Sequence, residues 1–309
     1  MHTIWLSLDT GIDDCFALLL LLKEKDIKID GIIATYGNVE LEKTFKNTRD
    51  VLHFAGYDDI KVYKGSASPL VDKPCYGYDC HGKNGVNNIK LVSSTAPIEN
   101  ENAFDAFYNR AKELNGQMEL IMLGPSSDFA NTYFRHPDIV KYLKRVVIMG
   151  GSFSGGNRTS QAEFNIYADP ISSEILFESG IDIVMAPLDV TLKSYFDLDD
   201  IKTLSSFDNK LSHLFEKMSV NIMKFYYKNS GYHRFFFHDA CPIVYLSDES
   251  IFKSIKCHVK IETKSKLAYG KTISDYDCDI PYEGKEVTAL IDVDRQKFVK
   301  HCFDIYKTY

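Results

Sequence analysis

The chain has 309 residues, of which 45% are hydrophobic and 26% are charged, so it can bury a sizeable core and is not disordered. Its formal net charge of -7 argues against a nucleic acid or an anionic membrane surface as its partner. No apolar run is long enough to span a membrane, and no signal peptide is visible. The seven cysteines lack zinc-ligand spacing, so we expect free thiols and a cytoplasmic protein.

Strand-like and helical patterns alternate through the first 187 residues. Strands are expected at 3–8, 29–35, 60–63, 118–123, 146–149 and 181–185. Helices are expected from residue 15 onwards, and at Leu41–Ala55, Ala103–Leu114 and 172–179. This alternation predicts an α/β fold with a mainly parallel open sheet flanked by helices, which is Rossmann-like.

The pattern changes after Pro187. We expect a long helix at 208–228, a strand pair at 257–262 and 267–274, a strand at Val287–Val293 and a closing helix at 294–306. No linker rich in Pro, Gly or Ser separates the two halves. We therefore expect a single domain over residues 1–309, with a helical and β-hairpin C-terminal portion. The long segments 64–100 and 152–166 are expected to be active-site loops.

Three carboxylates follow the first expected strand within six residues: Asp9, Asp13 and Asp14, bent around Gly11. In open α/β sheets, ligands bind in the crevice at the carboxyl ends of the strands. Acids crowded there repel one another unless a cation joins them, and hard cations such as Ca²⁺ or Mg²⁺ take oxygen ligands. The alternative is a solvated turn in which Asp13 and Asp14 cap the following helix.

Polar groups also follow the later strands and occur in the second long loop. These are Asn38, the carbonyl-bearing run at Leu123, Met149, Asn157, Glu163, Asn165 and the pair His238-Asp239. Taken singly, each has an ordinary explanation as a turn residue, a solvated loop residue or a helix cap. Together, amides and carboxylates without a basic cluster suit a neutral, hydroxyl-rich ligand. The glycine-rich segment at 150–156 lacks the spacing of a phosphate-binding loop.

Over essentially its whole length, the chain resembles the inosine-uridine-preferring nucleoside hydrolases. Six motifs carry the resemblance, in order: Ser7-Leu8-Asp9-Thr10-Gly11-Ile12-Asp13-Asp14, Gly37-Asn38, His81-Gly82, Met149-Gly150-Gly151, Ala162-Glu163-Phe164-Asn165 and His238-Asp239-Ala240-Cys241. The resemblance implies calcium-dependent hydrolysis of the N-glycosidic bond of ribonucleosides to nucleobase and ribose, in nucleoside catabolism and purine and pyrimidine salvage. We also expect a homo-oligomer, either a dimer or a tetramer.

The resemblance also implies a role for each matching residue. Ca²⁺ would be held by the side chains of Asp9, Asp14 and Asp239 and by the carbonyl of Leu123. Asp9 would also be the general base for a metal-bound water. The ribose 2′- and 3′-hydroxyls would contact Asp13, Asn38 and Asn165, and the 5′-hydroxyl would contact Asn157 and Glu163. Met149 would lie against the sugar, His81 would help to bind the substrate, and His238 would protonate the leaving base.

A 5′-phosphate would face the like charge of Glu163, and the sequence shows no basic residue placed to offset it. We therefore expect 5′-nucleotides to be poor substrates.

The chain departs from the family at Ser7, where the family has its first aspartate, and at Asp128, where it often has asparagine. Two alternatives remain open. One is a non-catalytic nucleoside- or ribose-binding protein, although a binder would not need the acids and the histidine that the chain retains. The other is a haloacid-dehalogenase-type phosphatase, because Leu8-Asp9-Thr10-Gly11 resembles an aspartyl nucleophile after a first strand. The preferred nucleobase depends on the loops at 76–88 and 225–237, whose conformation the sequence does not determine.

Overall fold

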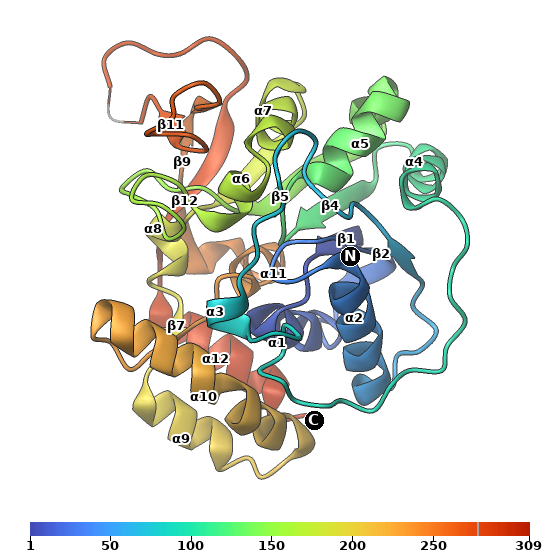
Figure 1. Cartoon of the computed structure of the whole chain (residues 1–309), viewed down its shortest axis with the longest axis vertical. Coiled ribbons are helices and arrows are strands. Elements are labelled where there is room, and N and C mark those ends of the chain that lie inside the picture. The colour runs from blue at the N-terminus through green and yellow to red at the C-terminus, as the bar shows by residue number, and fades with distance from the viewer. Residues whose placement is uncertain (277) are drawn as a thin grey trace.

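A computed structural model describes residues 1–276 and 278–309 (Figure 1). Its centre is an eight-stranded sheet in which all neighbouring strands run parallel except the last pair, which is antiparallel. This arrangement confirms the predicted α/β fold. In spatial order the strands are β3 (Val62–Lys64), β2 (Ile27–Ala34), β1 (His2–Leu8), β4 (Met118–Met122), β5 (Leu143–Met149), β6 (Ile183–Ala186), β12 (Val287–Val293) and β9 (Phe252–Cys257).

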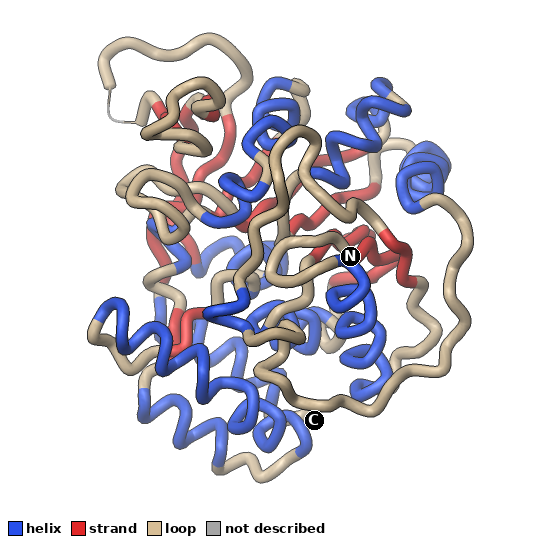
Figure 2. Tube along the Cα trace, viewed as in Figure 1, coloured by secondary structure: helices blue, strands red, loops and turns tan. Residues whose placement is uncertain are grey.

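Helices cover both faces of this sheet, so that the molecule has three layers (Figures 1 and 2). One face is covered by α1 (Ile12–Leu21), α2 (Leu41–Ala55), α9 (Leu198–Ser205), α10 (Lys210–Ser230), α11 (Ala240–Ser247) and α12 (Arg295–Tyr306). The other face is covered by α4 (Ala103–Leu114), α5 (Ser127–Arg135) and α7 (Pro170–Glu178). The observed bounds of α2 and α4 are those that the sequence predicts.

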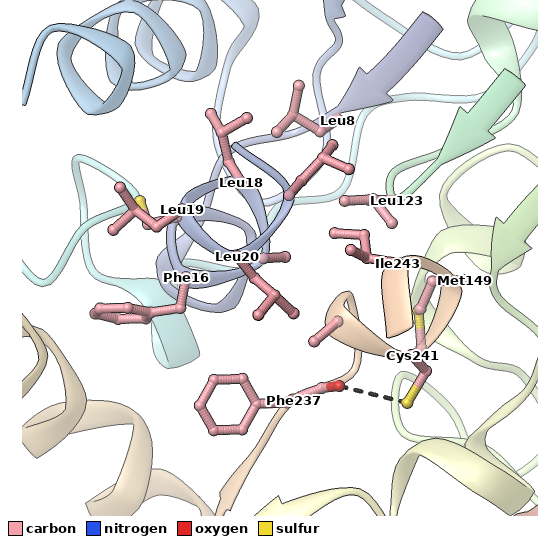
Figure 3. Packing of buried hydrophobic residues seen from close by; sticks show 14 of the residues in the cluster. Leu8, Phe16, Leu18, Leu19, Leu20, Leu123, Met149, Phe237, Cys241 and Ile243 are labelled. Carbon is pink, nitrogen blue, oxygen red and sulfur yellow. Dashed lines mark hydrogen bonds between the residues drawn. The ribbon is translucent and has the colours of Figure 1, made fainter. Parts of the chain in front are cut away.

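The side chains of the central strands alternate between the two helical layers, as the period of two along a strand requires. Leu6 and Leu8 of β1 join the core on the α1 side, whereas Trp5 joins the core on the α4 side. Figure 3 shows part of the larger cluster, where Leu8, Leu20 and Ile243 come from β1, α1 and α11. Because Leu8 is fully buried in this cluster, the core fixes the position of Asp9, the next residue.

The C-terminal portion differs in detail from the prediction. The expected strand pair exists as the antiparallel strands β10 (Val259–Ile261) and β11 (Thr272–Ser274), but each is only three residues long. The edge strand β9 was missed because its middle residues are largely exposed and give a weak apolar pattern.

The other segments contain short elements. These are α3 (Tyr78–His81), α6 (Phe164–Ala168), α8 (Leu188–Thr191), the strand pair β7 (Tyr195–Phe196) and β8 (Phe235–Phe236), and 3₁₀ turns at Pro137–Lys141 and Glu249–Ile251. Of these, α3 lies within the expected loop 64–100, and α6 begins within the expected loop 152–166 and extends beyond it. Among the described residues, no helix is both long and apolar enough to cross a bilayer.

The strand order places a crevice at one specific point of the sheet. From β1 the chain proceeds outward through β2 and β3, and it then returns to the other side of β1 and proceeds through β4, β5 and β6. Ligands of open α/β sheets bind at such a reversal, outside the carboxyl ends of the strands. The residues that follow β1 and β4 therefore lie at the position where such folds bind their ligands.

Candidate active site

The turn between β1 and α1 carries buried acids. Asp14 Oδ2 accepts hydrogen bonds from the Gly11 backbone N–H at 2.8 Å and from Asn38 Nδ2 at 2.9 Å. Asp14 thus does cap α1, as the alternative of a capping turn predicted, but both acids are buried rather than solvated. However, the Oδ1 atoms of Asp13 and Asp14 are buried and have no hydrogen-bond partner among the described residues. A buried carboxylate oxygen without a partner is costly, and a bound cation would remove that cost.

Asp239 approaches the same place from the start of α11. It occupies the N-cap position, but its side chain caps no backbone N–H. One carboxylate oxygen from each of Asp13, Asp14 and Asp239 lies within 4.8 Å of the other two. Burial, followed by repulsion from Asp14, raises the pKa of Asp13 to about 8, and burial raises the pKa of Asp14 to about 6. Crowded acids that resist ionisation, with only oxygen atoms to offer, fit a hard divalent cation.

Asp9 lies beside this cluster and is held by the neighbouring backbone. Its Oδ2 accepts a 2.7 Å hydrogen bond from the Asn38 backbone N–H. Gly37 and Gly124 pack against its two carboxylate oxygens, and a Cβ at Gly124 would lie 2.7 Å from Oδ1, so a side chain there would displace Asp9. Burial, and then repulsion by Asp14, raise the pKa of Asp9 well above its usual range. We expected Asp9 rather than Asp13 in the metal set, whereas the oxygens that converge within 4.8 Å include Asp13.

The carboxyl ends of β4 and β5 form the next wall of the site. Asn165 Nδ2 donates hydrogen bonds to the carbonyl of Leu123 at 2.7 Å and to the carbonyl of Met149 at 3.0 Å. These contacts hold Asn165 between the two strand ends and leave its Oδ1 as an acceptor. The Leu123 carbonyl retains a second lone pair, so it can still contact a ligand.

Glu163 begins the short helix α6 and is almost completely buried. Its carboxylate accepts hydrogen bonds from three backbone N–H groups, those of Gly151 at 2.9 Å, Asn165 at 2.8 Å and Ile166 at 3.1 Å. Burial raises its pKa to about 7, and these hydrogen bonds oppose that rise. Asn157 Oδ1 accepts a 2.8 Å hydrogen bond from the Phe164 N–H. Glu163 and Asn165 are therefore not solvated loop residues.

Two buried histidines face the acids. The Ile12 backbone N–H donates to His81 Nδ1 at 3.1 Å, so the neutral ring carries its proton on Nε2. His81 Nδ1 also lies 3.8 Å from Asp13 Oδ1. His238 is bonded at both nitrogens, to Thr191 Oγ1 at 2.8 Å and to the Tyr226 hydroxyl at 3.0 Å. Burial lowers the pKa of His81 to about 3 and that of His238 to about 4, so both rings are uncharged at neutral pH.

These groups surround one cavity of about 150 Å³ at the carboxyl end of the sheet. The structure brings all but one of the predicted site residues to its wall, and the exception, Asp14, lies in the acidic cluster with Asp13 and Asp239. The predicted residues on the wall are Asp9, Asp13, Asn38, His81, Leu123, Met149, Asn157, Glu163, Asn165, His238 and Asp239.

Sequence reasoning missed several other residues of the cavity wall. Tyr76, Asp79 and Cys80 come from the long loop before α4, and Phe225 comes from α10. The two base-recognition loops that we expected include these positions, but no pattern singled them out. Arg158 also lines the cavity, which corrects the expectation that no basic residue stands near Glu163.

Comparisons with known proteins agree with this geometry. The sequence profile of the family described as inosine-uridine preferring nucleoside hydrolase matches residues 4–300. The chain is 32% identical over 308 residues to the pyrimidine-specific ribonucleoside hydrolase RihA of Escherichia coli, covering 99% of this chain and 98% of the relative.

Two solved structures share the fold over nearly the full length of both chains. A purine-preferring ribonucleoside hydrolase from Gardnerella vaginalis superposes with a TM-score of 0.92 and 25% identity, covering 99% of this chain and 98% of the other. A plant nucleoside hydrolase, PpNRh1, has a TM-score of 0.94 and 24% identity, covering 100% and 99%. The phosphatase alternative has no support among these matches. The chain belongs to the inosine-uridine preferring nucleoside hydrolase family, and it is an enzyme that hydrolyses ribonucleosides.

Proposed function

We propose that this hydrolase depends on Ca²⁺ and uses Asp9 as the general base of the reaction. The observation that carries the proposal is the group of buried acids at the carboxyl end of β1, two of which have an unpartnered oxygen. The residues that would hold the ion are Asp14, Asp239 and the Leu123 carbonyl, together with Asp9 or Asp13. A bound Ca²⁺ would make water more acidic and would polarise the sugar hydroxyls.

Asp9 suits the role of base because the protein holds it rigidly beside the cavity. The Asn38 N–H fixes one oxygen, and the packing of Gly37 and Gly124 leaves its carboxylate little freedom to turn away. In the proposed step Asp9 takes a proton from water, the water oxygen bonds to the anomeric carbon, and the bond to the base nitrogen breaks. The electron pair of that bond leaves with the nucleobase. Carboxylates around the sugar stabilise the positive charge that develops on the ring.

The remaining residues of the wall would position the sugar. Asp13, Asn38 and Asn165 would bind the 2′- and 3′-hydroxyls, since they surround the acidic end of the cavity. Asn157 and Glu163 would bind the 5′-hydroxyl, with Met149 against the ring and His81 beside Asp13. This orientation places the base towards His238, Tyr226 and Phe225, which lie together on the wall.

His238 is proposed to supply the proton that the departing base requires. Burial lowers its pKa to about 4, so the neutral ring would relay a proton. It would gain a proton at one nitrogen as it gives one from the other, either to the base directly or through the bonded Tyr226 hydroxyl. Base preference is left open, because one relative is named pyrimidine-specific and another purine-preferring. We further propose that the enzyme acts in the cytoplasm in nucleoside salvage, where its seven unpaired cysteines would remain reduced.

The test is the release of free ribose from a panel of purine and pyrimidine ribonucleosides, measured after treatment with a chelator and again after Ca²⁺ is restored. Activity should disappear with the chelator and return with the ion. Asp9→Asn should retain substrate binding but turn over far more slowly, because an amide cannot accept the proton. The matched control is Asp59→Asn, at an exposed position away from the cavity. Chelator-resistant activity would refute the calcium proposal, and normal turnover of Asp9→Asn would refute its role as base.

A further inference from the structure

The mouth of the cavity carries one strongly cationic side chain. Arg158 is the sole lysine or arginine among the described residues that line the cavity, whereas five of them are acidic. Its side chain is exposed, and no carboxylate of the described residues lies within ion-pair distance of it. The guanidinium lies 5.9 Å from the centre of the Phe164 ring and close to the Cys75 thiol. It therefore spans the space between the loop that begins α6 and the loop that precedes α3.

The neighbours of Arg158 leave a second donor free and weaken the nearby negative charge. Asn157 Oδ1 accepts a hydrogen bond from the Phe164 N–H, so the Nδ2 group of Asn157 remains available as a donor. The Glu163 carboxylate is surrounded by the three backbone N–H groups that it binds, which offset much of its charge. The mouth of the cavity thus offers a guanidinium without a carboxylate partner and an amide N–H, and the Glu163 carboxylate on the same wall already accepts three hydrogen bonds.

We propose that Arg158 and Asn157 form an anion subsite that binds the phosphate of a 5′-phosphorylated ribose or ribonucleoside. The inference rests on the proposed function, which places the 5′-carbon of the ribose beside Asn157 and Glu163. A guanidinium binds phosphate through paired N–H groups, and phosphate is the substituent that extends ribose from this carbon. The subsite reverses the expectation that 5′-nucleotides are excluded by Glu163.

Ribose and ribose 5-phosphate are suitable probes, because neither contains a bond that the enzyme cleaves. Their dissociation constants are measured by titration calorimetry on the full chain with Ca²⁺ present. Four proteins are compared: the unmodified chain, Arg158→Gln, Arg158→Lys and Lys266→Gln. The last removes an equal charge from an exposed lysine outside the cavity wall. In parallel, kcat/KM is measured for uridine and for uridine 5′-monophosphate.

The unmodified chain should bind ribose 5-phosphate at least tenfold more tightly than ribose. Arg158→Gln should reduce that preference about tenfold, Arg158→Lys should keep part of it because the charge remains, and Lys266→Gln should keep all of it. The ratio of kcat/KM for uridine 5′-monophosphate to kcat/KM for uridine should fall most in Arg158→Gln, less in Arg158→Lys and not at all in Lys266→Gln. Equal binding of the two sugars, or a preference that Arg158→Gln does not change, would overturn the subsite alone if uridine is still hydrolysed. If neither sugar binds and no purine or pyrimidine ribonucleoside is hydrolysed, the proposed function fails as well.

Discussion

The Ser7 hydroxyl donates a 2.8 Å hydrogen bond to Asp128 Oδ2, and both residues are buried. The sequence presents these positions as two separate departures from the family, whereas the structure shows that they are partners. The other oxygen of Asp128 accepts a 2.7 Å bond from the Ser66 N–H. The family has its carboxylate at position 7 and often an amide at position 128. In this chain the carboxylate is at position 128, on α5, and the hydroxyl of Ser7 on β1 is its partner.

This arrangement predicts the pH dependence of stability. Burial raises the pKa of Asp128 from 3.8 to about 6, against the hydrogen bonds from Ser66 and Ser7. A carboxyl whose folded-state pKa is raised contributes stability that is complete below pH 4 and is lost as pH rises through 6. The loss is about 3 kcal/mol at pH 7, because the pKa rises from 3.8 to about 6 and each unit of pKa corresponds to about 1.36 kcal/mol. In Asp128→Asn the amide can donate to Ser7 and accept from Ser66, so this loss should disappear.

The measurement is urea unfolding at pH 4 to 7 in the presence of a chelator. The free energy of unfolding of Asp128→Asn, relative to the unmodified chain, should rise by about 3 kcal/mol across this range. Asp59→Asn serves as the control at an exposed aspartate. Parallel pH profiles for Asp128→Asn and the unmodified chain would show that Asp128 does not titrate as its burial implies.

Calcium should stabilise the folded chain through the acidic cluster. At 100 times its dissociation constant, a ligand that binds only the folded state adds about 2.7 kcal/mol, or roughly 5 °C in Tm for a chain of this size. Asp239→Asn should lose this increase. In metal-free buffer the same variant should melt above the unmodified chain, because it removes one member of a crowded cluster in which burial and mutual repulsion oppose ionisation. Lower stability of Asp239→Asn without metal would indicate a structural acid rather than an ion ligand.

Ribonucleosides should be strongly preferred over 2′-deoxyribonucleosides. Asp13 Oδ1 is buried without a hydrogen-bond partner among the described residues and is proposed to bond the 2′-hydroxyl, so a substrate that lacks this hydroxyl would leave the oxygen unpaired. Sites of this kind discriminate by roughly 10⁴-fold in kcat/KM. Asp13→Asn should reduce the ratio of kcat/KM for the ribonucleoside to that for the 2′-deoxyribonucleoside, because it lowers kcat/KM for the ribonucleoside more. Similar kcat/KM values for uridine and 2′-deoxyuridine would contradict the placement of the sugar.

The sequence predicted the parts of this protein that depend on local pattern. The amphipathic spacing of α2 and α4 gave their bounds, and polar residues after apolar strands led to the cavity. Strand order brings these strand ends together, whereas the expected grouping of Asp9 with Asp239 came from the resemblance to the nucleoside hydrolases.

The parts that depend on tertiary contacts could not be predicted. Arg158 reaches the cavity only because the backbone before Ala162 turns back on itself, with hydrogen bonds from the N–H groups of Arg158 and Thr159 to the Ala162 carbonyl. The pairing of Ser7 with Asp128 joins residues 121 positions apart. The edge strand β9 depends on β12 for its pairing, since its own apolar pattern is weak.

His238 provides the last prediction, because its hydrogen bonds separate a catalytic role from a structural one. Its ring is held between Thr191 and Tyr226, and burial lowers its pKa to about 4. If His238 helps to protonate the leaving base, His238→Ala should slow ribonucleosides by about 10²–10⁴-fold. It should slow a nitrophenyl riboside much less, because nitrophenolate departs without a proton.

Tyr226→Phe should show the same selective loss if the proton passes through the Tyr226 hydroxyl, and a smaller one if it passes directly from the ring. The measurement is kcat/KM for both substrates with all three proteins. Equal losses on the two substrates would mean that His238 only supports the wall of the site.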